Sequence, residues 1–216
     1  MKIIVKESQL DDMKDKMRVI PFDYVNYDWN IVKKLSKGKP FILKGNLLGD
    51  QIPKDDTSLG SLFEITGHLH LEQTNISSLG MLTKVGKSLN IRYCDIEDIN
   101  NLAHVGGNFD FSGTKIKSLN NLNTVEGHLH CSRYLEDFGE LTKIETFLNA
   151  SSCNITSLDK IESVGGYLDV SYTFIESFGN LKSVYGDLYI RDTELSDMYS
   201  EDEIRKNIYV RGQIHF

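Results

Sequence analysis

The sequence predicts an α+β, mainly β solenoid, in which short coils stack along one parallel sheet, with short or no convex helices and a cap at each end. The first observation is a 20-residue repeat that runs through seven copies from about residue 58. The copies begin at Leu59, Leu79, Ile99, Leu119, Phe138, Leu158 and Phe178, with one residue deleted near Leu135. Such a period indicates coils that cannot bury their apolar side alone and therefore stack.

The second observation is the apolar pattern within each copy. If the first residue of a copy is position 0, apolar residues recur at positions 0, 3, 6, 10, 12 and 17. Positions 10 and 12 alternate with polar neighbours, which is typical of a half-buried strand. We expect inward side chains at Leu69, Leu71, Leu89, Ile91, Phe109, Phe111, Leu129, Cys131, Leu148, Ala150, Leu168, Val170, Leu188 and Ile190. Positions 0 to 6 predict a single 3₁₀ turn or an irregular strand.

The third observation concerns turn residues. Each copy is preceded by Ser or Asp, whose side chains bond nearby backbone N–H groups in turns and helix caps. Position 1 is Gly, Asn or Asp in every copy, and these residues tolerate positive φ. The two columns together predict a left-handed corner in each coil.

The segment Leu69-x-Leu71-x-x-Thr74-x-Ile76 and its six copies resemble the core of the leucine-rich repeat, with Thr or Cys where that family has Asn or Cys. The Val-Gly-Gly units at 105–107 and 164–166 are similar to short repeats of bacterial and bacteriophage proteins and of receptor L domains. The resemblance covers residues 58–198. It implies a scaffold for protein–protein contacts, without a particular partner. Because the unit is short, a full convex helix is not expected.

Both ends of the chain predict caps that shield an open core. We expect residues 1–57 to form an N-terminal capping unit, 58–198 the seven repeats, and 199–216 a C-terminal cap of a short helix and a strand. Ser200 and Glu203 match a capping box, and a helix to about Lys206 follows. A strand over 207–211 would then place Ile208 and Val210 inward. In the N-terminal unit we expect strands at Lys2–Val5 and Phe41–Lys44, a helix at Ser8–Met17, and a helix at Asp28–Leu35 that places Trp29, Val32 and Leu35 near the core.

Composition excludes several classes of protein. The chain has 216 residues, 40% of them hydrophobic, with 24 basic and 31 acidic groups and a net charge of -7. Its length and apolar content argue against a disulfide-stapled miniprotein and against disorder. Its apolar runs are too short for a membrane span or a secretory signal. We therefore expect a cytoplasmic protein, in the host cytoplasm if a phage encodes it.

The charge is distributed unevenly along the chain. Residues 1–57 carry 11 basic and 9 acidic groups, and the remaining 13 basic and 22 acidic groups give residues 58–216 a net charge of -9. This balance disfavours nucleic acid as the default partner and favours a basic protein partner.

Catalytic and metal-binding patterns are weak, so no enzyme, cofactor or metal is expected. The pairs His68/His70 and His128/His130 lie three coils apart and cannot share one ion, so they are interpreted as solvated strand residues or as a pH-sensitive surface. Cys94 and Cys153 share a column but lie too far apart for a bridge. With Cys131, they are interpreted as buried small hydrophobes in a reducing compartment. The Gly-Gly pairs follow the repeat and are corner residues rather than phosphate loops.

The outward strand face is the candidate binding surface. Its second half gathers aromatic residues with two guanidinium groups, the residue types that carry most binding energy at interfaces. The predicted partner-binding residues are Phe147, Tyr167, Asp169, Tyr189, Arg191, Tyr209 and Arg211. The alternative is that the rings stack on neighbouring strands and merely cover a bare sheet.

The function expected from these observations is a non-catalytic protein–protein interaction scaffold that uses the exposed sheet face. A phage-encoded modulator or inhibitor of a host protein is one form of this function. A carbohydrate-binding module is an alternative, because Tyr beside Asp, Asn and Arg suits sugar stacking and hydrogen bonding. A structural component of a larger assembly, joined through edge strands or caps, is the other.

Overall fold

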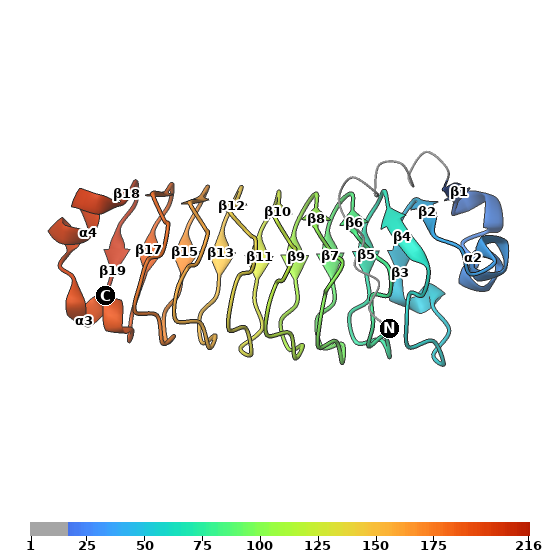
Figure 1. Cartoon of the computed structure of the whole chain (residues 1–216), viewed down its shortest axis with the longest axis horizontal. Coiled ribbons are helices and arrows are strands. Elements are labelled where there is room, and N and C mark those ends of the chain that lie inside the picture. Colours follow the sequence, from blue (N-terminus) through green and yellow to red (C-terminus); the bar gives the residue numbers. More distant parts are fainter. Residues whose placement is uncertain (1–16) are drawn as a thin grey trace.

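The chain folds as a solenoid whose coils follow one another along a single long axis (Figure 1). The structure, a computed structural model, describes residues 17–216. The mainly β fold with stacked parallel strands, few helices and helical caps is therefore confirmed. The strand predicted at Lys2–Val5 and the helix predicted at Ser8–Met17, apart from Met17, lie outside the described residues. Within 17–216, no helix combines the length and the apolar character that crossing a bilayer requires.

Each coil contributes one short strand to each of two parallel sheets. Sheet A has ten strands in the described part of the chain, and sheet B has nine. Sheet A consists of β1 (Arg18–Pro21), β2 (Phe41–Lys44), β4 (Leu62–Ile65), β6 (Lys84–Val85), β8 (His104–Val105), β10 (Thr124–Val125), β12 (Lys143–Ile144), β14 (Ser163–Val164), β16 (Ser183–Val184) and β18 (Tyr209–Val210). Sheet B consists of β3 (Leu47–Leu48), β5 (Leu69–His70), β7 (Leu89–Asn90), β9 (Phe109–Asp110), β11 (Leu129–His130), β13 (Leu148–Asn149), β15 (Leu168–Asp169), β17 (Leu188–Tyr189) and β19 (Ile214–His215).

Sheet A is the one departure from the predicted architecture, which had a single sheet. It forms at positions 5 and 6, where the repeat predicted a 3₁₀ turn or an irregular strand. Position 6 is Val or Ile in every copy, and position 5 is polar or charged. A β-branched inward residue next to an outward polar one favours a strand. Neighbouring coils pair there in register, as Val85 does with Val105.

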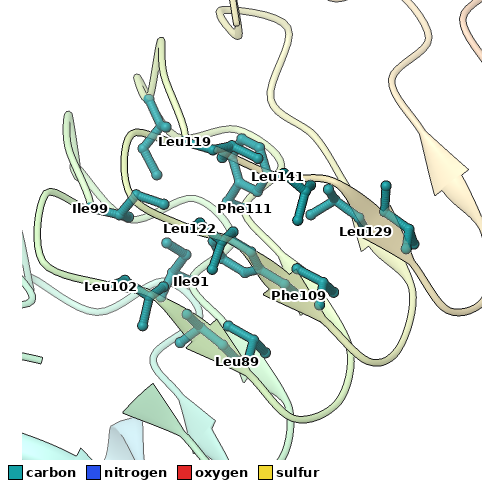
Figure 2. Packing of buried hydrophobic residues seen from close by; sticks show 14 of the residues in the cluster. Leu89, Ile91, Ile99, Leu102, Phe109, Phe111, Leu119, Leu122, Leu129 and Leu141 are labelled. Carbon is teal, nitrogen blue, oxygen red and sulfur yellow. The ribbon is translucent and has the colours of Figure 1, made fainter. Parts of the chain in front are cut away.

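The core is one continuous column of apolar side chains between the two sheets. Position 10 and 12 residues of adjacent coils pack on one another and on the corner residues at positions 0 and 3 (Figure 2). All the residues predicted to point inward are buried except Cys131, which is half-buried against the core. Inward pointing at position 10 is maintained in every coil because the register pairs Leu with Leu or Phe, for example Leu129 with Phe109 and Leu148.

The corners form as the turn columns predict. The Ser or Asp before position 0 accepts the backbone N–H two residues on, as in Ser78 Oγ from Gly80 N at 3.1 Å and Asp137 Oδ1 from Gly139 N at 2.9 Å. Position 1 has positive φ in six of the seven copies, with Asn100 as the exception. At Gly80 a side chain would also strike the Gly60 carbonyl of the preceding coil, so this corner needs both the left-handed backbone and the close approach.

The N-terminal unit joins both sheets. The 3₁₀ helices η1 (Asp23–Val25) and η2 (Gly49–Gln51) form its turns, and the helix α2 spans Trp29–Ser36. Asp28 caps α2 by accepting the backbone N–H groups of residues 30 and 31 at 2.8 and 3.3 Å. Trp29 and Val32 are buried, but Leu35 is 39% exposed, so its predicted place near the core is wrong. With Trp29 and Val32 inward, Leu35 lies on the margin of the buried stripe of α2.

The C-terminal cap differs from its predicted register. The helix α3 (Glu194–Met198) precedes α4 (Glu201–Asn207), which begins at the predicted capping box of Ser200 and Glu203. The helices lengthen this last coil, so Leu188 pairs with Ile214, 26 residues on, whereas Leu168 pairs with Leu188, 20 residues on. The predicted strand over 207–211 therefore belongs to sheet A as β18, and β19 supplies the last strand of sheet B.

Arg205 closes the open edge of sheet A at this end. In inner coils the carbonyls at positions 6 and 8 accept amides from the next coil, as Val184 O does from Arg211 N at 2.9 Å. After β18 no coil follows, and Arg205 donates instead, to Val210 O at 2.6 Å and Gly212 O at 2.8 Å. Glu201 accepts from Arg205 Nε at 2.7 Å and orients the guanidinium. A cation thus occupies the acceptors that another strand would use.

Truncation of one core residue tests the stacked core. Leu129 is fully buried between β9 and β13. We expect Leu129→Ala to lower the free energy of unfolding by about 2–5 kcal/mol, because the cavity lies between two coils that cannot both move in. Chemical denaturation measures this change. A loss below about 0.5 kcal/mol, the range of ordinary surface substitutions, would contradict the buried placement.

A second substitution tests the edge cap. We expect Arg205→Ala to lower the free energy of unfolding by about 1–3 kcal/mol, because it leaves two strand carbonyls without their charged donor. We also expect concentration-dependent association in sedimentation experiments, because the sheet edge is opened. Lys206→Ala, on the exposed side of the same helix, is the matched control and should change neither quantity. Equal behaviour of the two variants would contradict the assigned role.

Candidate functional site

The outer face of sheet B is the candidate binding surface, and its two halves are built differently. In the first half, position 9 side chains accept the backbone N–H of the equivalent residue in the next coil. We name this column the polar ladder: Asn46 Oδ1 from His68 N at 2.9 Å, His68 Nδ1 from Ser88 N at 3.3 Å, Ser88 Oγ from Asn108 N at 3.3 Å, and Asn108 Oδ1 from His128 N at 3.0 Å. These residues therefore satisfy backbone donors that would otherwise lack a protein partner.

In the second half of the face, rings replace the hydrogen bonds. We name the row His128, Phe147, Tyr167, Tyr189 and His215 the ring ladder. The ring centroids of His128 and Phe147 are 3.8 Å apart, and those of Phe147 and Tyr167 are 4.4 Å apart, both pairs stacked. Tyr167 meets Tyr189 edge to face at 6.2 Å, and Tyr189 stacks on His215 at 4.3 Å. His130 touches Phe147 edge to face at 5.1 Å.

The stacking determines what the ring ladder can offer to a partner. All five rings are half-buried. Phe147 has a ring stacked on each face, so neither face is free for a ligand. Each aromatic contact adds about 0.5–1.5 kcal/mol beyond the area that it buries. The alternative interpretation, in which rings cover a bare sheet, is therefore part of what the structure contains.

Four of the predicted site residues lie together on this face. Phe147, Tyr167, Asp169 and Tyr189 lie in or next to β13, β15 and β17. Asp169 Oδ1 accepts the Ser171 backbone N–H at 3.0 Å, so one of its oxygens has a local structural role. Burial, followed by the nearby carboxylate Asp169, raises the pKa of Tyr167. Tyr189 donates to Asp187 at 3.3 Å, and burial first and Asp187 second raise its pKa.

Tyr209 and Arg211 do not belong to this surface, which corrects the predicted patch. Tyr209 lies in β18 of sheet A and meets Tyr185 edge to face at 5.7 Å. Arg211 follows β18, and its backbone N–H donates to Val184 O. The lengthened last coil moved both residues to the other sheet. Arg191 remains near the predicted site, exposed two residues after Tyr189.

The histidine and cysteine patterns gain no metal site. In the part of the chain described, no three His, Cys, Asp or Glu side chains gather closely enough to hold an ion. His68 and His70 have ring centroids 5.4 Å apart on β5 and its flank, and His128 and His130 lie on and beside β11, three strands along. Cys94 and Cys153 are buried and free, as predicted, and each thiol donates to a carbonyl of the preceding coil, Leu71 O at 2.8 Å and Ser132 O at 3.1 Å.

Sequence reasoning missed two features of this surface. His215 completes the ring ladder, which was hidden because the cap helices break the 20-residue spacing. An exposed corner beside sheet B also carries Arg–Tyr pairs: Arg92 lies 5.1 Å from the Tyr93 ring centroid, and Arg133 lies 4.9 Å from that of Tyr134. Position 14, which includes Tyr93, has positive φ in most coils, so it turns these side chains outward.

No protein-family model, no curated protein and no solved structure matches this chain. The relation to leucine-rich repeats therefore stays a prediction from the repeat pattern.

A pH experiment tests the ring ladder. Burial, followed by the charge of His130, lowers the pKa of His128 below 6.5. Because the unfolded chain then binds more protons below about pH 6.5, the free energy of unfolding falls as the pH drops through that value. We expect His128→Phe, which keeps a ring beside Phe147, to lose less stability than the wild type between pH 7.5 and 5. Denaturation at both pH values measures this, and equal losses would contradict the buried, stacked imidazole.

Proposed function

We propose that this protein is a non-catalytic protein–protein interaction scaffold that binds its partner on the outer face of sheet B. The observation that carries the proposal is the ring ladder, a row of five rings that span successive coils and hold one another in place. Four strand steps of about 4.8 Å give the row a length of about 19 Å. That length suits a patch at the centre of a protein interface.

The stacked arrangement favours binding because the rings are ordered before a partner arrives. Association normally costs about 0.5–1.5 kcal/mol for each mobile side chain that becomes fixed. Rings held between neighbours on adjacent strands have little of this freedom left to lose. Tyr167 and Tyr189 present amphipathic edges, and Arg191 lies beside them, which are residue types enriched at interface hot spots.

The partner is expected to be basic. Residues 58–216 have a net charge of -9. Asp169 and Asp187 lie on the same face as the ring ladder. Electrostatic complementarity of this kind mainly accelerates the encounter and selects among partners. The relation to leucine-rich repeats, cytoplasmic location and the role of a phage-encoded modulator of a host protein belong to this proposal, and the repeat pattern is their only support.

The two alternative functions have less support. A carbohydrate module needs a free aromatic face for the sugar, and the faces of Phe147 are both covered. Assembly through sheet edges needs free strand acceptors, and Arg205 occupies those of β18.

Affinity capture tests the proposal. The tagged chain is used to capture proteins from cells of the organism that encodes it, and the double variant Tyr167→Ser/Tyr189→Ser is used in parallel. We expect the variant to lose at least about tenfold of the captured partner, since hot-spot truncations cost about 2 kcal/mol or more. Hydrogen exchange on the purified complex should show protection in β13, β15 and β17.

The control is Tyr24→Ser, which removes a tyrosine that is 82% exposed in the N-terminal unit, far along the chain from the ring ladder. This variant should capture as much partner as the wild type. Capture that is unchanged in the double variant, while circular dichroism shows that it is folded, would exclude the ring ladder as the contact.

A further inference from the structure

A groove lies at the C-terminal corner of the solenoid, beyond the end of the ring ladder. Its volume is about 710 Å³, and three exposed rings line it: Tyr172 (58% exposed), Phe174 (66%) and Phe216 (46%). Ligand sites typically have volumes of about 300–1,000 Å³. Phe174 is the most exposed phenylalanine of the described chain, and a phenylalanine in water on a groove wall is a costly arrangement unless a ligand covers it.

The same groove carries carboxylates that have no cation partner. Asp192, Glu194 and Asp197 line it, and within residues 17–216 no Lys, Arg or His nitrogen lies within 4 Å of their oxygens. Elsewhere on the repeats, carboxylates pair with a lysine of a neighbouring coil, as Glu140 does with Lys160 at 2.6 Å and Glu162 with Lys182 at 2.9 Å. With Arg191 as its one cation, the groove lining has a net charge of -2.

We propose that this groove binds a short segment of a partner protein in which an apolar side chain stands beside lysine or arginine. The apolar side chain packs between Phe174 and Phe216, and the cations pair with Glu194 and Asp197. Rings and carboxylates in one open groove fit this chemistry, because an apolar occupant alone would leave the carboxylates unpaired. The proposal does not depend on the ring ladder, although Arg191 places the groove next to Tyr189.

Charge disfavours the other occupants of the groove. A second copy would bring its own repeat region, which has a net charge of -9, against these carboxylates. Anionic lipid surfaces and nucleic acid are repelled for the same reason. A basic peptide segment is attracted, and the attraction is strongest at low ionic strength.

Amide NMR shifts of the full chain provide the test. The probe is the peptide acetyl-Lys-Leu-Phe-Lys-amide, and the matched control is acetyl-Glu-Leu-Phe-Glu-amide. We expect the basic peptide to shift amides within 172–174, 191–197 and 216 in a saturable manner at millimolar concentration, and the acidic peptide to bind at least about fivefold more weakly. No saturable shifts, shifts mapped elsewhere, or equal affinity for both peptides would each overturn the proposal.

Two variants separate the rings from the charges. Phe174→Ser should abolish the saturable shifts, and Glu194→Gln/Asp197→Asn should reduce the preference for the basic peptide. Both sites are exposed, so both variants should fold, and Tyr24→Ser should bind as the wild type does. A dimer in sedimentation experiments that Phe174→Ser dissolves would identify a second copy as the occupant and overturn the proposal. Loss of binding in Tyr167→Ser/Tyr189→Ser alone would assign the contact to the ring ladder instead.

Discussion

The coil-to-coil hydrogen-bond ladder is the constraint on which the rest of this structure depends. Each coil is too short to bury its own apolar side, so its backbone groups and its leucines are satisfied only by the coils above and below. The in-register pairing at position 10 aligns every column of side chains along the axis. Buried columns become a continuous core, and outward columns become ladders. A feature of one outward column therefore extends over several coils, which is why this fold can present long, ordered surfaces.

Position 9 illustrates how one geometric problem has two chemical solutions. In the early coils, Asn, Ser and His side chains accept the free N–H of the following coil. From His128 onward, rings at this and the neighbouring outward position stack on the next coil instead. Both solutions stabilise the stack, but they leave different surfaces. The polar ladder presents groups that are already bonded, whereas the ring ladder presents apolar edges beside hydroxyl groups and carboxylates, which favours a protein contact.

The two sides of the C-terminal end differ in the same way. Arg205 replaces the missing coil at sheet A and meets the carbonyls that would otherwise attract another strand. On the corner beside sheet B, exposed rings and unpaired carboxylates remain around an open groove. A solenoid must close its core at this end, and the helices α3 and α4 do so by lengthening the last coil. That insertion closes the core, shifts the strand register and creates the groove.

The sequence alone determined the repeat, the inward residues and the corners, because these depend on local periodicity and turn chemistry that every copy states again. It did not predict sheet A, although Val or Ile at position 6 carried the signal, since a two-residue strand has too short an alternation to be distinguished from a turn. It placed Phe147, Tyr167 and Tyr189 on one face but misplaced Tyr209 and Arg211. Only the tertiary structure decided which strand follows β17, because the 26-residue last coil lies outside the repeat. The contacts of His215, Arg205 and Phe174 were likewise decided by side chains from distant segments meeting at the cap.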